Sequence, residues 1–466
     1  LYFHLPMLAP LLRDQHLSLN EKFIKDIPVA KNRALVKYFF QQFNENVTPH
    51  VNDLRQSYIH NDSNEWNILT TNNKISGFID FGDLAYSPLI NELAVALTYV
   101  CYDKGDPLKW VEPVIKAYNK IIPLQEKELS VLYYCIAAKL CISVCNSAHS
   151  KLNNPDNIYA FSSEKNAWNM LYKWIEINPI KAENQFRTAA GFDILKSDSL
   201  DNKVEDRFEN LSEIVSLSYN KPIHMTKAAF QYMYDGEGNT YLDAYNNIPH
   251  VGHCHPDVVK AGQQQMATLN TNTRYLYDNL ADYSKQLLGA FPKSLNKVFF
   301  VNSGSAASDL AIRLAKFHTK NDKLMVMEHG YHGHTQNGIE ISDYKFNNKK
   351  GEGQKDHIIK TVIPDTYRGE HTNNDGTAGE QFANDAVNLL NNESIAAFIS
   401  EPVVGCGGQV PLAKGYLKAL YPIIRKNGGV CISDEVQTGF GRLGDYFWGF
   451  EAQDVVPDMV VIGKPM

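Results

Sequence analysis

Basic residues are in slight deficit in this sequence of 466 residues. Its 45 lysines and arginines are outnumbered by 52 aspartates and glutamates, which gives a formal net charge of −7. A broad cationic surface for a polyanion is therefore not expected, and neither nucleic acid nor a membrane surface is a favoured partner. Small molecules remain as the expected ligands.

Cysteine is also scarce. The chain has 7 cysteines, an odd number, and no Cys-x-x-Cys pair. This usage excludes a secreted disulfide framework and favours the reducing cytoplasm. Cys141 and Cys145 are four residues apart on a predicted helix, but no histidine or carboxylate joins them at metal-ligand spacing, so we interpret them as buried thiols.

No apolar run is long enough for a bilayer span of roughly 20 residues. The most apolar stretch, residues 129–145, is interrupted by Lys139 and predicts a buried helix. The chain opens at Leu1 without an initiator methionine or a signal peptide, and it ends at Met466 soon after a strand-like run. We therefore expect a fragment, cut at both ends.

The length predicts about three structural units at roughly 150 residues per domain. Residues 1–181 are rich in helical patterns, with one hairpin over residues 68–81, and residues 178–210 lose their apolar periodicity. From about residue 213 short apolar strands alternate with helical stretches, which predicts a mostly parallel sheet covered by helices. The polar residues 347–353 predict an exposed loop.

Five predicted strands of this second part end in polar or reactive residues. They are residues 298–301 before Asn302-Ser303-Gly304-Ser305, residues 324–327 before Glu328-His329-Gly330-Tyr331-His332-Gly333, residues 396–399 before Glu401, residues 430–432 before Asp434-Glu435-Val436-Gln437, and residues 459–462 before Gly463-Lys464. In an open α/β sheet the ligand lies beyond the carboxyl ends of the strands, so these segments should converge on one crevice. Polar turns that simply end strands are the weaker interpretation.

Three of these endings suggest specific chemistry. Gly304 and Ser305 precede a predicted helix over residues 309–318 with Leu310, Leu314 and Phe317 on its apolar face, so their N–H groups could bind phosphate. A desolvated lysine at position 464 could condense with an aldehyde. A buried carboxylate at position 434 needs a cation, which a protonated pyridine nitrogen would supply.

The neighbouring side chains suit an aromatic ligand. Tyr331 and Val436 could cover the two faces of a ring, and Gln437 could hydrogen-bond a ring oxygen. The predicted site could therefore bind a phosphate, an aldehyde, a pyridinium nitrogen and both faces of an aromatic ring. Pyridoxal 5'-phosphate carries all of these groups.

The motifs resemble the class III aminotransferase family over about residues 217–466. They are Asp434-Glu435-Val436-Gln437-Thr438-Gly439-Phe440-Gly441-Arg442, Tyr331-His332-Gly333, Asn302-Ser303-Gly304-Ser305 and Gly463-Lys464-Pro465-Met466. The resemblance implies an α/β fold of the aspartate aminotransferase-like type (fold type I) and a homodimer. It also implies that Lys464 binds the cofactor aldehyde, Asp434 pairs with the pyridinium, Gln437 contacts the ring hydroxyl, and His332 and Glu401 occupy pocket positions.

Further segments look like the phospho-lyase branch of that family, which acts on ethanolamine phosphate or phosphohydroxylysine. They are Asn270-Thr271-Asn272-Thr273-Arg274-Tyr275-Leu276-Tyr277-Asp278-Asn279, Glu340-Ile341-Ser342-Asp343-Tyr344-Lys345-Phe346, Pro364-Asp365-Thr366-Tyr367-Arg368-Gly369 and Cys406-Gly407-Gly408-Gln409. The resemblance leaves two reactions open on a primary amine or amino-alcohol phosphate. One is transamination, and the other is elimination of phosphate and ammonia.

The first part carries a different constellation. Asp62 lies in His60-Asn61-Asp62, Asn67 follows five residues later, and Asp80 follows a hydrophobic strand. Asp62 could orient a hydroxyl proton, while Asn67 and Asp80 could offer oxygens to magnesium on ATP phosphates. A solvated hairpin rich in Asp and Asn is the alternative, but the complete set favours phosphoryl transfer.

This constellation resembles the C-terminal lobe of the aminoglycoside phosphotransferase and hydroxylysine kinase family over about residues 39–177. No glycine-rich loop or nucleotide-facing lysine precedes it. We therefore predict a mostly helical kinase-like C-lobe without its N-lobe over residues 1–185, a linker over residues 186–212, and a class III aminotransferase domain over residues 213–466 that stops after Lys464.

Several features leave alternatives open. His250, His253 and His255 could bind a metal, but a structural turn is favoured. Most arginines lie at surfaces or in ion pairs, so no substrate clamp is assigned among Arg274, Arg313, Arg368 and Arg442. Three hypotheses for the whole chain survive: a pyridoxal phosphate enzyme, which is favoured, an ATP-dependent amino-alcohol or aminoglycoside-type phosphotransferase, and a non-catalytic remnant.

Overall fold

The structure is a computed structural model that describes residues 20–157, 161–373 and 375–466. These residues form two compact units. Unit 1 comprises the described residues up to Tyr245 together with Val251–Asn270, and unit 2 comprises Asn246–His250 and Thr271–Met466.

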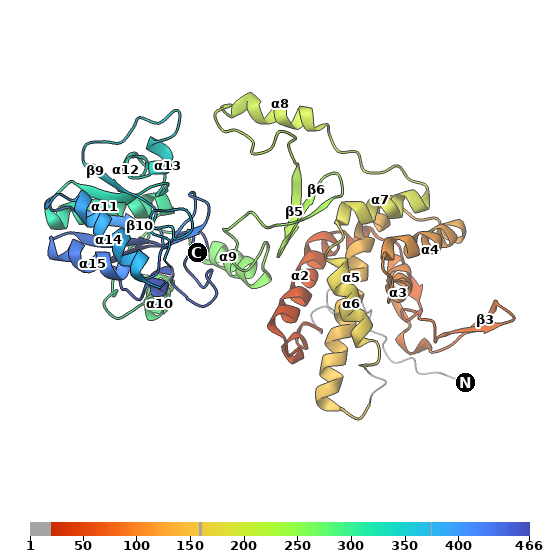
Figure 1. The fold of residues 1–466 in the computed structure, drawn as a ribbon. Coiled ribbons are helices and arrows are strands. Elements are labelled where there is room, and N and C mark those ends of the chain that lie inside the picture. The colour runs from red at the N-terminus through yellow and green to blue at the C-terminus, as the bar shows by residue number, and fades with distance from the viewer. Residues whose placement is uncertain (1–19, 158–160, 374) are drawn as a thin grey trace. The chain divides into compact units, whose positions relative to one another are not determined.

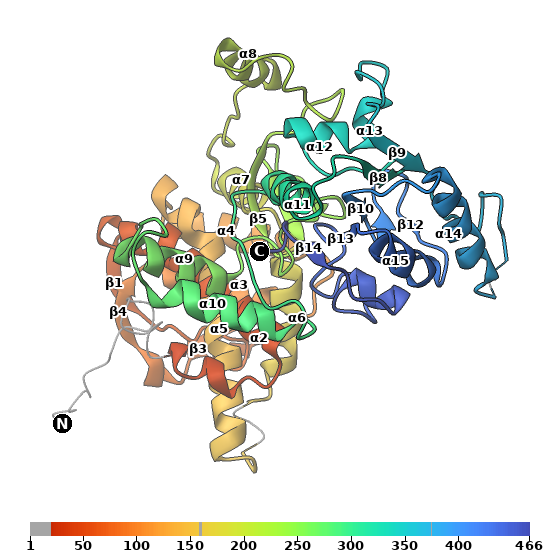
Figure 2. The same cartoon turned by 90° about the vertical axis from the view of Figure 1, so that its left-hand side faces the viewer.

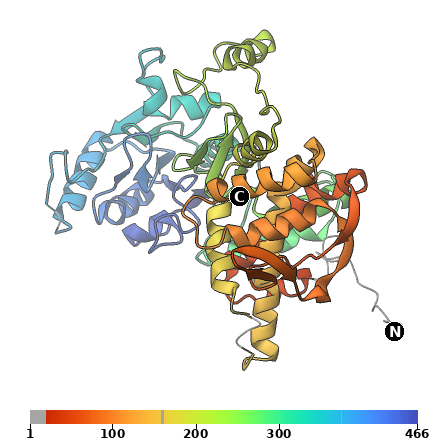
Figure 3. The same cartoon turned by 90° about the vertical axis from the view of Figure 1, so that its right-hand side faces the viewer.

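Unit 1 is built around the helix α5 (Glu126–Asn153), which confirms the predicted buried helix. Helix α5 contacts α2 (Ala30–Asn46), α3 (Ile90–Val100), α6 (Glu164–Trp174) and α7 (Pro179–Ala190). Figure 3 shows the helices of this unit, drawn in red to yellow, gathered together. By length and composition α5 could cross a membrane, but 83% of its most apolar window is buried within the protein, as is usual for a core helix. The remaining helices of unit 1 are η1 (Ile24–Asp26), η2 (Thr48–Asp53), η3 (Phe81–Asp83), α4 (Pro107–Ile121), α8 (Leu200–Asn210) and α9 (Pro256–Thr268).

Two small antiparallel sheets adjoin these helices. Strand β1 (Gln56–Ile59) pairs with β4 (Ala85–Pro88), and β2 (Ile68–Thr71) pairs with β3 (Lys74–Phe78). The β2–β3 hairpin confirms the prediction for this region and projects from the helices in Figure 1. Its turn residues Asn72 and Asn73 have φ angles of 52° and 59°, which asparagine tolerates better than most residues.

The region predicted to be a linker is largely helical. Helix α7 extends to Ala190, and α8 follows after a short polar segment. Helix α7 begins at Pro179, and the fully buried side chain of Asn178 before it accepts a hydrogen bond from the Ile180 N–H and so caps the helix. The loss of apolar periodicity therefore reflects solvent-exposed helix surface, above all in α8, which buries no residue.

A third antiparallel sheet packs on the helices of unit 1, namely β5 (Met225–Ala229), β6 (Tyr232–Asp235) and β7 (Thr240–Leu242). The buried Tyr234 donates a hydrogen bond to the Ile175 carbonyl, and the Asn178 side chain donates to the carbonyls of Asp235 and Asn239 at 2.9 Å each. Ala229 and Tyr234 belong to the same hydrophobic core as α5. The compact units therefore do not divide at the predicted boundary near residue 212, and that boundary stays a prediction.

Unit 2 contains the predicted parallel sheet. Its strand order is β14 (Met459–Val461), β13 (Val430–Asp434), β10 (Ala397–Ser400), β8 (Leu324–Met327) and β9 (Ile358–Thr361), and each paired neighbour is parallel. The other elements are α10 (Asp278–Gly289), α11 (Gly304–Thr319), α12 (Gln336–Glu340), α13 (Asp343–Phe346), α14 (Thr377–Leu389), α15 (Tyr416–Lys426), η5 (Gly449–Gln453) and the short pair β11 (Val403–Val404) and β12 (Val410–Pro411).

Alternate residues of the strands face two separate cores. Met325, Phe398 and Cys431 pack with α14 and α15, whereas Val326 and Ile399 lie in the core that α11 shares. Figure 2 shows α11 on one side of the sheet and α14 and α15 on the other. Because both faces are covered, the strands are hydrophobic along their whole length, and polar residues collect at their ends.

Two predictions about unit 2 are wrong. Residues 298–301 form no strand, and Phe299 and Val301 are 65% and 44% exposed, because no described strand pairs with them. On α11 the buried residues are Ser308, Ala311, Ile312 and Ala315, whereas Phe317 is 75% exposed. The packing face thus consists of small residues, which let the helix approach the sheet closely, together with Ile312. Leu314 and Phe317 are exposed and Leu310 is only partly buried, so the predicted apolar face is not the packing face.

Candidate functional site

Four neighbouring strands of unit 2 end at one edge of the sheet. Asp434 is the last residue of β13, Glu401 follows β10, and Lys464 lies three residues beyond β14. The loop after β8 carries Tyr331 and His332. The parallel pairing places these four endings together, as the sequence predicted.

Asp434 and His332 form a buried pair. The Nδ1 of His332 lies 2.7 Å from Oδ2 of Asp434, and the two side chains are 0% and 4% exposed. Burial of the ring disfavours its charged form, but the hydrogen bond to Asp434 and the charges of Asp434 and Glu401 outweigh burial and raise the pKa of His332. The Val436 N–H donates to the other oxygen of Asp434 at 3.1 Å, so the carboxylate is held from both sides.

Lys464 carries the reactive amine of this cluster. Burial lowers its pKa, against the opposing charges of Asp434 and Glu401, and Arg442 lowers it further. Its φ angle of 37° lies in the left-handed region, a sparsely populated conformation for lysine. Asp434 and Glu401 are therefore near enough to act on the amine electrostatically, and the amine is easier to deprotonate than an exposed lysine.

Glu401 is the second carboxyl group of the cluster. Its two oxygens accept hydrogen bonds from the N–H groups of Tyr331 at 3.2 Å and Gly405 at 3.3 Å. Burial, followed by the charge of Asp434, raises the pKa of Glu401 to about 7, while His332 and the two N–H groups oppose this shift. Glu401 can therefore hold a proton near neutral pH, whereas an exposed glutamate cannot.

The N-terminus of α11 provides a candidate phosphate cradle. Ser303 caps the helix by accepting from the Ala306 N–H, and the first N–H groups of a helix have no acceptor within it. The Ser305 hydroxyl accepts from the His334 N–H at 3.1 Å. Gly333 has a φ angle of +120°, and a Cβ there would lie 2.7 Å from Ser305, so only glycine fits against this turn.

The residues proposed to contact a ring lie around the same cluster. A Cβ on Gly304 would lie 3.1 Å from Val436, so the helix start and Val436 are in close contact. Gln437 accepts a hydrogen bond from Asn247 at 3.2 Å, and a Cβ on Gly405 would lie 2.8 Å from the Gln437 amide. The Tyr331 ring makes edge contacts with His334 and Tyr344.

These residues suit pyridoxal phosphate. The donor set combines an amine of lowered pKa at Lys464, a carboxylate at Asp434 with a buried partner, and a hydroxyl beside free helix N–H groups. In addition, Nε2 of His332 is buried without a hydrogen-bond partner among the described residues. The side chains at the strand ends therefore fit the group that the sequence suggested.

Three other residues of this region were not assigned from the sequence. Asn247 binds Gln437, Cys406 lies near Glu401 and Lys464, and Lys345 lies beside Tyr331. Cys406 and Lys345 are in segments that marked the phospho-lyase resemblance, which was the available signal. Asn247 had no signal, because its partner is 190 residues away.

Unit 1 holds a second cluster, centred on Asp62. Asn67 donates to Oδ2 of Asp62 at 3.1 Å, and the Tyr99 hydroxyl donates to Oδ1 at 2.8 Å. Lys139 of α5, the residue that interrupts the apolar run, has its Nζ 3.8 Å from the same Oδ1. The structure thus brings Asp62 and Asn67 together, and it adds Tyr99 and Lys139, which the sequence did not suggest for this site.

Asp80 and Asp83 belong to the same surroundings. Asp80 is exposed with a φ angle of 60°, and the Ile79 N–H beside it donates to the Asn67 carbonyl at 3.1 Å. Burial raises the pKa of Asp83, Lys139 opposes this, and the charges of Asp62 and Asp80 add to it. Several carboxylates that act on one another are a suitable setting for a divalent cation.

Several of the other residues considered for metal binding already have partners within the protein. His253 bonds Asp243 at 2.7 Å, and His250 contacts Arg442, so these histidines have protein partners. Within the described ranges, one group of metal-ligating type occurs, Glu370, His371 and Asp385, where His371 and Asp385 already pair at 2.7 Å. Cys141 and Cys145 are buried free thiols, as predicted.

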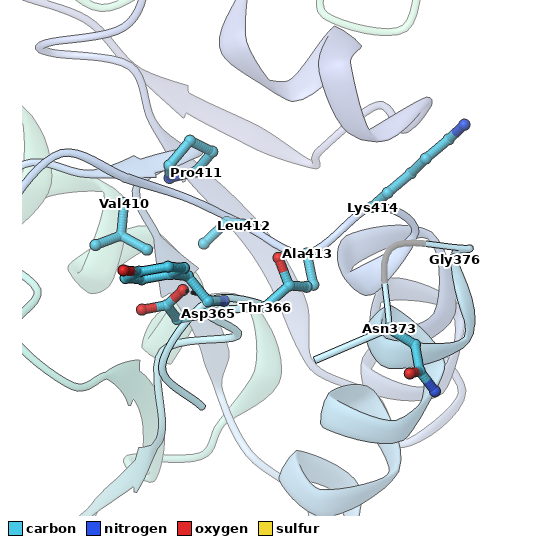
Figure 4. A pocket seen from close by; sticks show the side chains of 10 residues that line it. Asp365, Thr366, Asn373, Gly376, Val410, Pro411, Leu412, Ala413 and Lys414 are labelled. Carbon is cyan, nitrogen blue, oxygen red and sulfur yellow. Dashed lines mark hydrogen bonds between the residues drawn. The ribbon is translucent and has the colours of Figure 1, made fainter. Parts of the chain in front are cut away.

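A pocket of about 220 Å³ lies elsewhere in unit 2. Asp365, Val410 and Leu412 are among its lining residues, and none of the strand-end residues is. In Figure 4 the Lys414 side chain points away from Asp365. We assign no chemistry to this pocket.

Comparison with known families covers most of the chain. Residues 215–466 match the family model of class III aminotransferases, and residues 9–128 match that of the phosphotransferase enzyme family. The first match confirms the resemblance predicted over about residues 217–466. The second confirms the phosphotransferase resemblance but covers a more N-terminal range than residues 39–177.

Individual relatives and solved structures agree with the first match. An alanine–glyoxylate aminotransferase 2-like protein of Drosophila melanogaster is 42% identical over 294 residues, which cover 61% of this chain and 59% of that protein. Ethanolamine-phosphate phospho-lyase homolog 1 of Caenorhabditis elegans is 42% identical over 261 residues, which cover 53% and 56%. The chain thus spans between about half and three fifths of the length of these relatives.

Two solved structures share the fold. A phospholyase from Arthrobacter in complex with phosphoethanolamine has a TM-score of 0.53 and 34% identity, covering 57% of this chain and 63% of that chain. A taurine:2-oxoglutarate aminotransferase from Bifidobacterium kashiwanohense, in complex with PLP and glutamate, has a TM-score of 0.52 and 25% identity, covering 58% and 63%.

Proposed function

The chain belongs to the class III aminotransferases and carries a phosphotransferase-family segment, and from this we propose that Lys464 and Asp434 are the catalytic residues of a pyridoxal phosphate enzyme acting on a primary amine or amino-alcohol phosphate. The observation that carries the proposal is the half-buried Lys464 amine with its lowered pKa, set near the carboxyl groups of Asp434 and Glu401. We further propose that the enzyme is a homodimer of the cytoplasm.

The cofactor, when bound, supplies an aldehyde that takes up amines and a ring that draws electrons from the bound substrate. Lys464 would hold the cofactor through its aldehyde and would move the proton of the substrate carbon beside the nitrogen. Asp434, held by His332 and the Val436 N–H, would keep a proton on the pyridine nitrogen. Gly304 and Ser305 would bind the phosphate, while Tyr331, Val436 and Gln437 would orient the ring.

Between the two reactions, we propose elimination of phosphate from an amino-alcohol phosphate. Support comes from the similarity to a phospho-lyase homolog and to a phospholyase solved with phosphoethanolamine. Transamination is the alternative, because an alanine–glyoxylate aminotransferase 2-like protein is equally similar.

Cofactor addition and product analysis test this proposal. We expect a visible absorption band when pyridoxal phosphate is added, and we expect its loss in Lys464→Ala but not in Lys414→Ala, a lysine at the pocket of Figure 4. With ethanolamine phosphate, release of inorganic phosphate and ammonia without a keto acid indicates a lyase. A requirement for pyruvate or 2-oxoglutarate indicates a transaminase and contradicts elimination.

A second candidate function is phosphoryl transfer from ATP in unit 1. The observation in its favour is the partly buried network that holds both oxygens of the Asp62 carboxylate. Asp62 would accept the hydroxyl proton of an amino alcohol, and Asn67 and Asp80 would bind magnesium with ATP. The test is ATP-dependent phosphorylation of ethanolamine or hydroxylysine by the full-length protein, which Asp62→Ala should abolish.

A further inference from the structure

Lys345 lies on α13 with an ammonium group that has no ion-pair partner among the described residues. Its Nζ is 5.6 Å from the centroid of the Tyr331 ring and 5.7 Å from that of the Tyr344 ring. Aromatic faces attract a cation without neutralising it. The charge of Lys345 is therefore available to a ligand.

The neighbouring Lys360 shows the contrast. Its Nζ lies 3.1 Å from Oδ1 of Asp343, the first residue of α13, and Oδ2 of Asp343 accepts from the His329 N–H at 2.8 Å. Asp343 is thus committed to Lys360 and to the loop after β8. This arrangement anchors the short helix and leaves Lys345, two residues later, without a carboxylate.

Tyr331 and Cys406 connect Lys345 to the cluster that holds the reactive amine. Burial and the charge of Glu401 raise the pKa of the Cys406 thiol, while Lys464 and Lys345 both lower it. Both amines therefore act on one thiol, and Lys345 borders the cluster that holds Lys464, because the Tyr331 ring lies beside Lys345 and the Tyr331 N–H donates to Glu401 at 3.2 Å. A substrate whose nitrogen is held at Lys464 would extend toward a region with a free cation.

The arginines offer less to such a substrate. The Arg442 guanidinium donates to the Asn247 carbonyl at 2.9 Å and lies 3.2 Å from Nδ1 of His250. Arg368 lies over the Tyr367 ring, and Arg274 is exposed. Among these cations, Lys345 combines a free charge with a place beside Tyr331.

We propose that Lys345 binds the phosphate group at the far end of the substrate and so determines the preference for amino-alcohol phosphates over neutral amines. This inference rests on the proposed function, because it takes the substrate nitrogen to be bound at Lys464. A phosphate dianion gains more from one ammonium group than a carboxylate does, since the Coulomb energy scales with charge.

Stable adducts of cofactor and substrate test the inference by binding alone. The probes are the reduced phosphopyridoxyl adducts of ethanolamine phosphate, of ethanolamine and of 3-aminopropionate, and their dissociation constants are measured on the cofactor-free protein by calorimetry. We expect the wild type to bind the phosphate adduct about tenfold or more tightly than the ethanolamine adduct, which is the strength of one charge-assisted hydrogen bond.

Substitutions of Lys345 test whether this preference depends on its charge. Lys345→Met should reduce this preference to about twofold or less while leaving the affinity for the ethanolamine adduct unchanged, and Lys345→Arg should retain most of it. Lys350→Met, which removes an exposed lysine just beyond α13, should behave as wild type. An unchanged preference in Lys345→Met, or an equal loss for both adducts, overturns the inference.

Two further results separate the inference from the proposed function. If Lys345→Met weakens the carboxylate and phosphate adducts equally, Lys345 is the anion site but the phospho-lyase assignment fails. If neither pyridoxal phosphate nor any adduct binds the wild type, the proposed function fails and the role of Lys345 fails with it.

Discussion

The two charged clusters of this chain satisfy their groups in different ways. In unit 1 the Asp62 carboxylate is bound by side chains alone, namely Tyr99, Asn64, Asn67 and Lys139. In unit 2 Asp434 and Glu401 are bound largely by His332 and backbone N–H groups, and the amine of Lys464 is left with a lowered pKa. The first cluster is saturated by its own residues, whereas the second keeps reactive groups available for a ligand.

The largest effect should follow from breaking the buried pair of unit 2. Asp434→Ala leaves the fully buried His332 without its partner, so we expect the free energy of unfolding of unit 2 to fall by about 3–5 kcal/mol. Urea unfolding followed by hydrogen exchange of the backbone amides of β13, which lies in unit 2, measures this loss. The exposed Asp445→Ala is the control, and an equal loss in both variants contradicts the prediction.

The second prediction concerns pH. The folded-state pKa of Glu401 is raised from 4.5 to about 7, so the folded protein binds the proton more tightly and stability falls as pH rises from about 4.5 to about 7. The raised pKa of His332 acts in the same direction, because its contribution is present below the ordinary histidine pKa and is lost as pH rises through the folded value.

Glu401→Gln should remove most of this slope, on the order of 3 kcal/mol over the window. The measurement is the urea midpoint of unit 2 at a series of pH values. The exposed Glu380→Gln should keep the wild-type slope. A flat profile in the wild type would show that the carboxyl groups of this cluster do not interact as described.

The third prediction tests the saturated cluster. Tyr99→Phe removes a 2.8 Å hydrogen bond to a charged carboxylate, so we expect a loss of about 1.5–3 kcal/mol in the stability of unit 1. Tyr58→Phe is a suitable control because Tyr58 is 74% exposed. If both variants unfold at the same urea concentration, Tyr99 does not hold Asp62 in solution.

The smallest effect is expected for Lys139→Met. Met fills a similar volume on a largely buried helix, and Asp62 keeps three other donors, so stability should change by no more than about 1 kcal/mol in either direction. Phosphoryl transfer, if unit 1 performs it, should still decrease. A large loss of stability by urea unfolding would mean that the ammonium group is needed to offset the carboxylate.

The sequence predicted that the strand-end residues lie together, because each of them ends a buried strand or follows one within a few positions. Asp434 and Glu401 needed only the local pattern and the rule that parallel strands end at one edge. Residues 298–301 show the limit of such reasoning, because an apolar run becomes a strand only where another strand is free to pair with it.

Only part of the Asp62 cluster was predicted, because some of its residues are distant from one another in the chain. Asp62 and Asn67 are close in the chain, so their spacing is visible in the sequence. Tyr99 and Lys139 come from α3 and α5, and helical periodicity does not say which distant residue a side chain will meet. An isolated lysine within an apolar helix was the one available signal, and it indicated a buried charge without naming its partner.

The sheet β5–β7 determines where this polypeptide can be divided into parts that fold separately. It lies within the stretch matched to class III aminotransferases, yet Tyr234 and Ala229 complete the core around α5. If the chain is divided where the class III aminotransferase segment begins, the N-terminal product loses Tyr234 and Ala229 and exposes part of its apolar core. The C-terminal product then contains the sheet β5–β7 without the helices on which it packs. The border between the two family segments is therefore not a border between folding units, and a polypeptide made to contain unit 1 alone should end near residue 270.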